Sequence, residues 1–298
     1  MSGSGARSAR LAQVLLWVVP ALWSSNYIIA RLANGVIAPH ALALGRWSFA
    51  LAFMLPFVAR ELLKDGAPWR REWRQLLVLG GTGMWICGAW VYLGGQSTTA
   101  TNIALIYAAT PVAIAALSVK LLHERMSMAQ RVAVGFALAG VLFIIVKGDI
   151  GNLMAVRFTV GDGWIVGAAI SWTVYSVMLR LWPSVLSPAA RLAAIIMGGI
   201  VVLLPFTLAE WASGPALPFT PMAAGLVLLA AVVPGVLSYT AYSYLQRELG
   251  ASRTALLLYL APVYGAFNAW LLLGELPGWH HAVGAALILP SIWLATRR

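Results

Sequence analysis

The sequence has 298 residues, of which 61% are hydrophobic and only 10% charged, and its formal net charge is +11. No ordinary soluble domain has this composition. The chain contains no phosphate-binding glycine loop of an ATPase, and its longest loops are too short to fold alone. Any activity is therefore expected between membrane-embedded helices.

Ten apolar segments are predicted to cross the membrane, because about 20 apolar residues span a bilayer core. They are residues 11–31, 41–60, 75–95, 102–121, 130–147, 162–181, 189–209, 222–245, 254–273 and 280–296. The first segment follows a short basic stretch, but no small-residue cleavage site follows it, so we expect a retained helix.

The basic residues indicate the orientation of these segments. If the amino terminus is cytoplasmic, 16 of the 20 Lys and Arg residues lie on the cytoplasmic side, three lie outside and one lies within a span. This bias is the topology signal of an inner-membrane protein with both termini inside, and not a nucleic-acid patch. Cys87 is the single cysteine, which excludes an intramolecular disulfide and a multi-cysteine metal site.

The first segment carries Trp23, Asn26 and Tyr27 on roughly one helical face, and the sixth repeats this layout with Trp172 and Tyr175. Polar side chains in lipid usually face a partner or a cavity. These residues are therefore candidates for substrate binding. The alternative is interhelical hydrogen bonding, with the tryptophans as packing residues.

The second segment contains Arg46, the only charged residue well inside a span. An unpaired arginine at that depth is expensive. Either it binds a substrate carboxylate, or it reaches outward to the interface or holds backbone carbonyls. The third and eighth segments contribute two further candidates, Tyr92 and Tyr239. Aromatic residues at helix ends commonly form an interfacial belt instead.

The fourth segment and the ninth are copies of one pattern. Residues 101–124, TNIALIYAATPVAIAALSVKLLHE, align with residues 252–275, SRTALLLYLAPVYGAFNAWLLLGE, at a shift of 151 positions. Pro111 and Pro262 remove a backbone donor in mid-helix and are candidate hinges, or else static kinks. Asn268 is a further candidate for the cavity. Glu124 and Glu275 end the two copies and are expected to cap helices or anchor loops.

The remaining segments repeat at a shift of 149, which places Trp23 on Trp172 and Pro39 on Pro188. The chain is thus predicted to be a tandem duplication, with residues 1–150 as one repeat and 151–298 as the other. Five crossings per repeat is an odd number, so the second repeat is inverted across the membrane, as in many transporters. The fifth and tenth segments look peripheral, facing lipid or a second subunit in a homodimer.

Both copies, with their Ala-Leu run, Pro-Val pair and terminal Glu, followed by an Ala-Val-Gly helix, resemble the drug/metabolite transporter superfamily. The resemblance covers essentially the whole chain and is to the bacterial ten-helix (EamA-type) branch, which commonly carries an Arg where Arg46 stands. It implies an all-α membrane fold with a basket of helices around a central cavity. The aromatic-rich segments are similar to those of aromatic amino-acid exporters. His123 stands where the family pattern has Gly before Glu124.

These observations predict an exporter of small amphipathic metabolites, aromatic or other amino acids, working by alternating access and without a cofactor or a metal. The alternatives are an exporter of drugs or other metabolites, and a membrane-embedded transferase. Transferase chemistry usually needs a His, Asp or Glu beside the substrate, and here all of these lie at loops or helix ends. For the same reason no obligatory proton coupling is expected.

Overall fold

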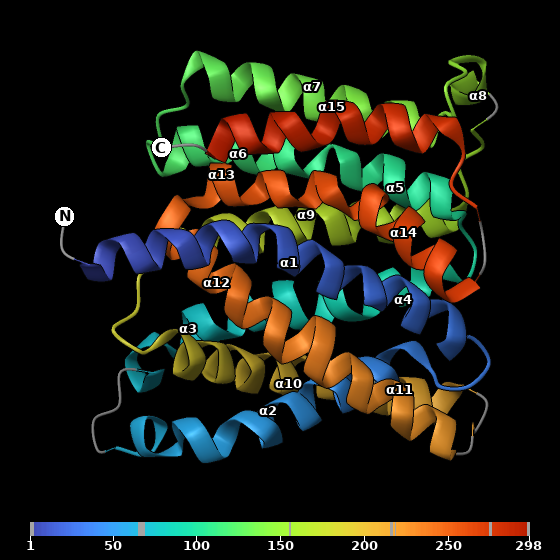
Figure 1. Ribbon diagram of the computed structural model, residues 1–298. Helices are drawn as coiled ribbons and strands as arrows, with labels where there is room; N and C mark the ends of the chain where they lie inside the picture. Colours follow the sequence, from blue (N-terminus) through green and yellow to red (C-terminus); the bar gives the residue numbers. More distant parts are fainter. Residues whose placement is uncertain are drawn as a thin grey trace.

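The computed structural model describes residues 3–64, 69–154, 156–214, 217, 219–273 and 276–296. Some side chains within these ranges, that of Tyr27 among them, lie outside the described residues, as does the whole of Glu275. Every regular element in the described ranges is a helix, so the prediction of an all-α protein is confirmed (Figure 1).

The helices follow one another to and fro along a single axis (Figure 1). The first half contains α1 (Gly3–Ala33), α2 (Pro39–Leu62), α3 (Trp69–Gly80), η1 (Gly81–Trp90), α4 (Val91–Gly95), α5 (Ala100–Ala108), α6 (Thr110–Leu121) and α7 (Met128–Ile145). The short α8 (Gly151–Met154) leads to α9 (Val160–Leu181), α10 (Pro188–Ser213), α11 (Pro221–Ala231), η2 (Val232–Leu237), α12 (Ser238–Leu249), α13 (Ala251–Ala255), η3 (Leu256–Leu260), α14 (Ala261–Leu273) and α15 (Trp279–Thr296).

Helix α1 begins and α15 ends at the same end of the bundle, on the left in Figure 1. We call this the terminal end and the opposite one the far end. Eight helical stretches among the described residues are long and apolar enough to cross a membrane. They correspond to the first eight predicted segments. The last two predicted segments correspond to the α13–η3–α14 run and to α15, which is a shorter apolar helix.

Prolines and polar caps explain where several helices begin. Pro39 and Pro188 open α2 and α10, where a missing backbone donor costs nothing because the first N–H groups of a helix have no internal partner. Ser127 and Gln130 form a capping box at the start of α7. Pro111 and Pro262 follow a change of helix type, since α6 begins after a turn at Ala109 and α14 after the 3-10 helix η3.

The described helices of the two halves interleave. Helix α2 packs along α10, and α7 packs along α15, so the two segments expected to be peripheral cover each other. Small residues allow the backbones to approach closely. A Cβ on Gly140 would lie 2.9 Å from the Gly284 carbonyl oxygen, and a Cβ on Gly284 would lie 2.8 Å from that of Gly140. Close backbone approach of this kind is typical of helix packing in membranes.

Contacts between the halves occur in matching pairs. Helix α10 packs on α3 and η1, and in the same way α2 packs on α11 and η2. Helix α9 packs on η1 and α6, whereas α1 packs on η2, α12 and α14. Each of these contacts between the halves thus has a counterpart with the halves exchanged.

Candidate functional site

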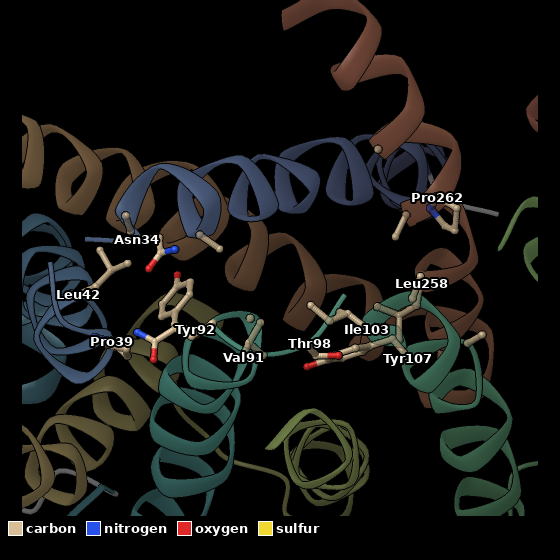
Figure 2. A pocket seen from close by; sticks show the side chains of 18 of the residues that line it. Asn34, Pro39, Leu42, Val91, Tyr92, Thr98, Ile103, Tyr107, Leu258 and Pro262 are labelled. Atoms are coloured by element: carbon tan, nitrogen blue, oxygen red, sulfur yellow. The ribbon is translucent and has the colours of Figure 1, made fainter. Parts of the chain in front are cut away.

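A cavity of about 590 Å³ lies at the far end of the bundle, between α1, α2, α4, α5, η3 and α14. Figure 2 shows side chains from these elements and the α4–α5 connection around it, with Asn34 and Tyr92 on one side and Tyr107, Leu258 and Pro262 on the other. The lining residues Asn34, Gly95 and Gln96 are exposed. The cavity therefore has its mouth at the far end.

A second cavity of about 110 Å³ lies deeper in the bundle. It shares Val91, Tyr107, Leu258 and Ala261 with the larger one. Trp23 also lines it, ten residues before the end of α1, so by helix rise it lies about 15 Å from the far end, near the middle of a bilayer. The larger cavity is thus a vestibule that leads to a narrow chamber at half depth.

Arg46 lines this chamber and is 4% exposed. Its Nη1 donates to Asn26 Oδ1 at 3.3 Å and to the Tyr92 hydroxyl at 3.4 Å, and its Nη2 donates to the Pro234 carbonyl oxygen at 2.9 Å. The Tyr92 hydroxyl in turn donates to Asn26 Oδ1 at 2.8 Å. Since all these partners are neutral, the guanidinium charge has no carboxylate partner among the described residues.

Two buried N–H donors of the chamber lack an acceptor among the described residues. One is Arg46 Nε and the other is Trp172 Nε1, on a side chain that is 6% exposed. A buried unpaired donor costs about 1–3 kcal/mol, and an exception of this kind needs an explanation. A bound molecule with an acceptor group would supply one.

Aromatic rings close the chamber toward the terminal end. The ring centroid of Trp23 lies 5.2 Å from that of its repeat counterpart Trp172 and 5.1 Å from that of Tyr242. Tyr239 packs edge-on against Trp23 and Trp172. One turn farther on, the Tyr242 hydroxyl hydrogen-bonds Ser176 at 2.9 Å. These buried rings separate the chamber from the terminal end of the bundle.

Two stretches of wide π-helix border the site at corresponding places in the two halves, η1 and η2. Three consecutive carbonyl oxygens of η1, those of Thr82, Gly83 and Met84, accept hydrogen bonds from Ser171, Tyr239 and Trp47 respectively. In η2 the Pro234 carbonyl accepts from Arg46. Such segments occur often at functional sites, and here they supply backbone acceptors to four side chains of three other helices.

Most residues that the sequence singled out are brought together. Trp23, Asn26, Arg46, Trp172 and Tyr239 line the chamber, Tyr92 lines the vestibule and Pro262 lies in the vestibule wall. Others lie elsewhere: Tyr175 is fully buried and lines neither cavity, Asn268 donates to Ser24 Oγ at 2.6 Å and so ties α14 to α1, and Pro111 lines neither cavity.

Sequence reasoning missed Tyr107 and Leu258, which line both cavities. They are equivalent positions of the predicted repeat, since the shift of 151 places one on the other, and each stands four residues before the proline of its copy. The position one helical turn before each proline could therefore have been used to predict these two cavity-lining residues. The sequence signal for the π-helical stretches is weaker and consists of the glycines of residues 80–83 and the Pro234-Gly235 pair.

Comparison with known proteins finds similar proteins that are described as transporters. The model of a family described as EamA-like transporter family matches residues 10–146 and 159–297. A protein of Archaeoglobus fulgidus described as an uncharacterized transporter is 24% identical over 287 residues, which is 96% of this chain and 97% of that protein.

Two further relatives and one solved structure extend this comparison. A probable terminal-alkyne amino-acid exporter of Streptantibioticus cattleyicolor is 24% identical over 93% of this chain and 90% of its own length. An uncharacterized transporter of Bacillus subtilis is 28% identical over 80% of this chain and 78% of its own. A crystal structure with 20% sequence identity superposes with a TM-score of 0.75 and covers 96% of both chains, so it shares the fold.

Proposed function

We propose a function for this chain, which belongs to the EamA-like transporter family and is an integral membrane transporter. In this proposal it exports small amphipathic carboxylates, amino acids foremost, across the inner membrane by alternating access. The far-end vestibule admits or releases the substrate, and the chamber at half depth binds its carboxylate.

The observation that carries this proposal is the pair of unsatisfied donors in the chamber. Arg46 Nε and Trp172 Nε1 are buried without an acceptor, and the Arg46 charge has no carboxylate partner among the described residues. Hydrogen bonds between a guanidinium and a carboxylate are about twice as strong as neutral ones. A substrate carboxylate would satisfy both the charge and the donors, which neutral protein partners do not.

The rest of the lining favours an apolar substrate body. The vestibule, at about 590 Å³, is within the range of small-molecule sites, and its polar groups are few. The rings of Trp23, Trp172 and Tyr239 offer faces to an aromatic side chain or an ammonium group. None of the described residues that line the two cavities is acidic, which disfavours a cationic drug. The amino-acid exporter among the relatives supports the same substrate class.

Ten crossings in two inverted repeats are part of the proposal. The family model matches two stretches separated by residues 147–158, in agreement with repeats at 1–150 and 151–298. The matching pairs of contacts between the halves support a two-fold relation, and chain ends at one side require an even number of crossings. Inverted repeats place a substrate site at the midplane between the halves, where Trp23 meets Trp172.

The charge bias assigns the terminal end to the cytoplasm. The described conformation then faces outward, with its vestibule open to the outside and its aromatic rings closing the inner side. To admit substrate from the cytoplasm, the helices that are broken at Pro111 and Pro262 would bend at these positions. A homodimer is compatible with this scheme, but α7 and α15 already cover much of each other.

The proposal is tested by a transport screen of the twenty amino acids in liposomes that contain the purified protein, with empty liposomes as the baseline. We expect at least one amino acid with an aromatic or aliphatic side chain to be transported. The Trp172→Ala variant should lower that rate at least about tenfold through lost stacking and a lost donor, measured at equal protein level.

Trp73→Ala is the matched control, because Trp73 lies in the first turns of α3 and is 49% exposed. It should leave the rate within about twofold, as is usual for surface substitutions. Equal losses from the two variants would argue against the chamber, and a screen without any transported amino acid would redirect the proposal to other carboxylates or to drugs.

A further inference from the structure

Three carboxylates join helix ends across the bundle through backbone N–H groups. At the terminal end Glu61 accepts from the Ser187 N–H and hydroxyl, which joins α2 to the start of α10. At the far end its repeat counterpart Glu210 accepts from the N–H groups of His40 and Ala41, which joins α10 to the start of α2. Helices α2 and α10 are thus held together at both ends at once.

Glu124 makes a third connection, of a different kind. Its Oε1 accepts from the Ala251 N–H at 2.9 Å and its Oε2 from the Ser252 N–H at 3.0 Å. These bonds join the end of α6 to the start of α13 at the terminal end, and among the described residues no carboxylate makes the matching connection at the far end, where Glu275 lies outside the described residues. The expectation that Glu124 anchors a helix end is confirmed, and the structure adds which helix it anchors.

The backbone on both sides is shaped for this contact. His123 has a φ of 53°, and the Glu124 N–H bonds back to the Ser118 carbonyl, which turns the carboxylate toward α13. Gly250 has a φ of 84°, and a Cβ there would lie only 2.8 Å from Glu124 Oε1. The positive φ favours glycine at that position, and the missing Cβ leaves room for the Glu124 carboxylate. Two residues in unusual conformations therefore serve one contact.

The position of the contact decides its role. The contacts of Glu61 and Glu210 hold α2 to α10 at both ends, so they do not account for one end being open and the other closed. Glu124 acts only at the closed end, and it links the two helical runs that are broken at Pro111 and Pro262. Around it Ser252 and Thr254 of α13 and Ser118 of α6 are all buried. Substrate from the terminal end cannot reach the chamber past these helices unless they separate.

We propose that Glu124 is the latch of the terminal-end gate: its carboxylate holds α6 against α13 in the outward-facing conformation, and its release is part of every transport cycle. This inference rests on the alternating access proposed above. Glu124 does not touch substrate, so it is a positioning residue, and weakening it should shift the population toward the conformation that is open at the terminal end.

The experiment follows two reporter cysteines in a Cys87→Ser background. Ser118→Cys reports on the terminal end, since that side chain is fully buried and its hydroxyl has no hydrogen-bond partner among the described residues. Ala104→Cys, in the vestibule lining, reports on the far end. A membrane-impermeant maleimide is added from each side in right-side-out and inside-out vesicles, and labelling rates are compared with and without Glu124→Gln.

With Glu124 replaced by Gln, labelling of Ser118→Cys from the terminal side should rise about tenfold, which corresponds to a shift of about 1.4 kcal/mol in the gate equilibrium. Labelling of Ala104→Cys from the far side should fall in the same vesicles. Glu61→Gln is the matched control, because it removes the same kind of contact at the same end, and it should change neither rate by more than about twofold.

Three results would overturn the latch: unchanged labelling of Ser118→Cys, a rise at both reporters as in local unfolding, or the same shift from Glu61→Gln. Because labelling needs no substrate, the outcome is independent of the amino-acid screen. A reciprocal shift without any transported amino acid would sustain the latch and refute only the proposed substrate class.

Discussion

At the scale of single residues, Arg46 combines both roles that its place in a span suggested. It holds a backbone carbonyl, that of Pro234, and it also lines the chamber with an unpaired Nε. Its neutral partners Asn26 and Tyr92 fix the guanidinium without cancelling its charge. A cation that is positioned but not neutralised is what a carboxylate site requires.

Replacing Arg46 by Gln should raise the substrate concentration for half-maximal transport about 10- to 100-fold, since a hydrogen bond to a charged group contributes about 1.5–3 kcal/mol. The measurement is initial transport rate against substrate concentration in liposomes. Arg60→Gln is the control, because Arg60 is an exposed residue of the same helix. A half-maximal concentration unchanged by Arg46→Gln would mean that the arginine is structural.

Loss of the hydroxyl should affect the stability of the protein differently at two buried tyrosines. Tyr239 donates to the Gly83 carbonyl at 3.1 Å, so Tyr239→Phe should destabilise the protein by about 0.5–1.5 kcal/mol. The buried Tyr175 hydroxyl has no partner among the described residues, so Tyr175→Phe should be neutral or stabilising. Thermal unfolding midpoints in one detergent check this pair, and a lower midpoint for Tyr175→Phe would reveal a bound partner at its hydroxyl.

At the scale of elements, glycines decide how closely helices pack. A Cβ on Gly80, at the end of α3, would lie 2.2 Å from the Gly199 backbone nitrogen on α10. The two backbones are therefore in direct contact beside the start of η1. This contact fixes the π-helical carbonyls that receive Ser171, Tyr239 and Trp47.

Gly80→Ala should consequently destabilise the protein by about 1–3 kcal/mol or more, because neither backbone can yield without moving a helix. Gly225→Ala in α11 is the matched control, since a Cβ there meets nothing within 4 Å and alanine favours helix. Denaturation midpoints of the two variants are compared with that of the parent. Similar midpoints for all three would show that α3 and α10 pack less closely than described.

At the scale of the whole molecule, the distribution of titratable groups bears on energy coupling. Arginine side chains in general do not release a proton in proteins, so they are unsuited to carry protons across a membrane. No Asp, Glu or His of the described part of the chain lines either cavity. Asp162 at the start of α9 accepts hydrogen bonds from the vestibule residue Thr98 and from Asn102, so this acid contacts the wall of the vestibule without lining it.

We therefore predict that substrate moves down its own gradient without an obligatory proton. In liposomes with a substrate gradient and no pH gradient, transport should proceed at its full rate, and a pH gradient alone should drive no accumulation. Uphill movement driven by a pH gradient would contradict this, and Asp162→Asn would then be the first variant to measure, with Glu124→Gln beside it.

Sequence patterns alone were enough to predict the positions of the helical segments, the repeat pattern, the charge bias and the presence of a charge within a span. Each of these depends on how one segment interacts with lipid, water or its own backbone, and such properties are readable from local composition. The count of ten crossings and the inversion of the repeats remain proposals that rest on these same local signals.

The three-dimensional structure was needed to learn which residues contact one another. Asn26, Arg46 and Tyr92 converge from three helices, whereas Asn268 bonds Ser24 instead of lining the chamber, and Glu124 finds its partner 127 positions away. These outcomes depend on crossing angles and on backbone approaches such as that of Gly80 to Gly199, which arise from the packing of several helices at once. A pattern within one segment does not contain that information.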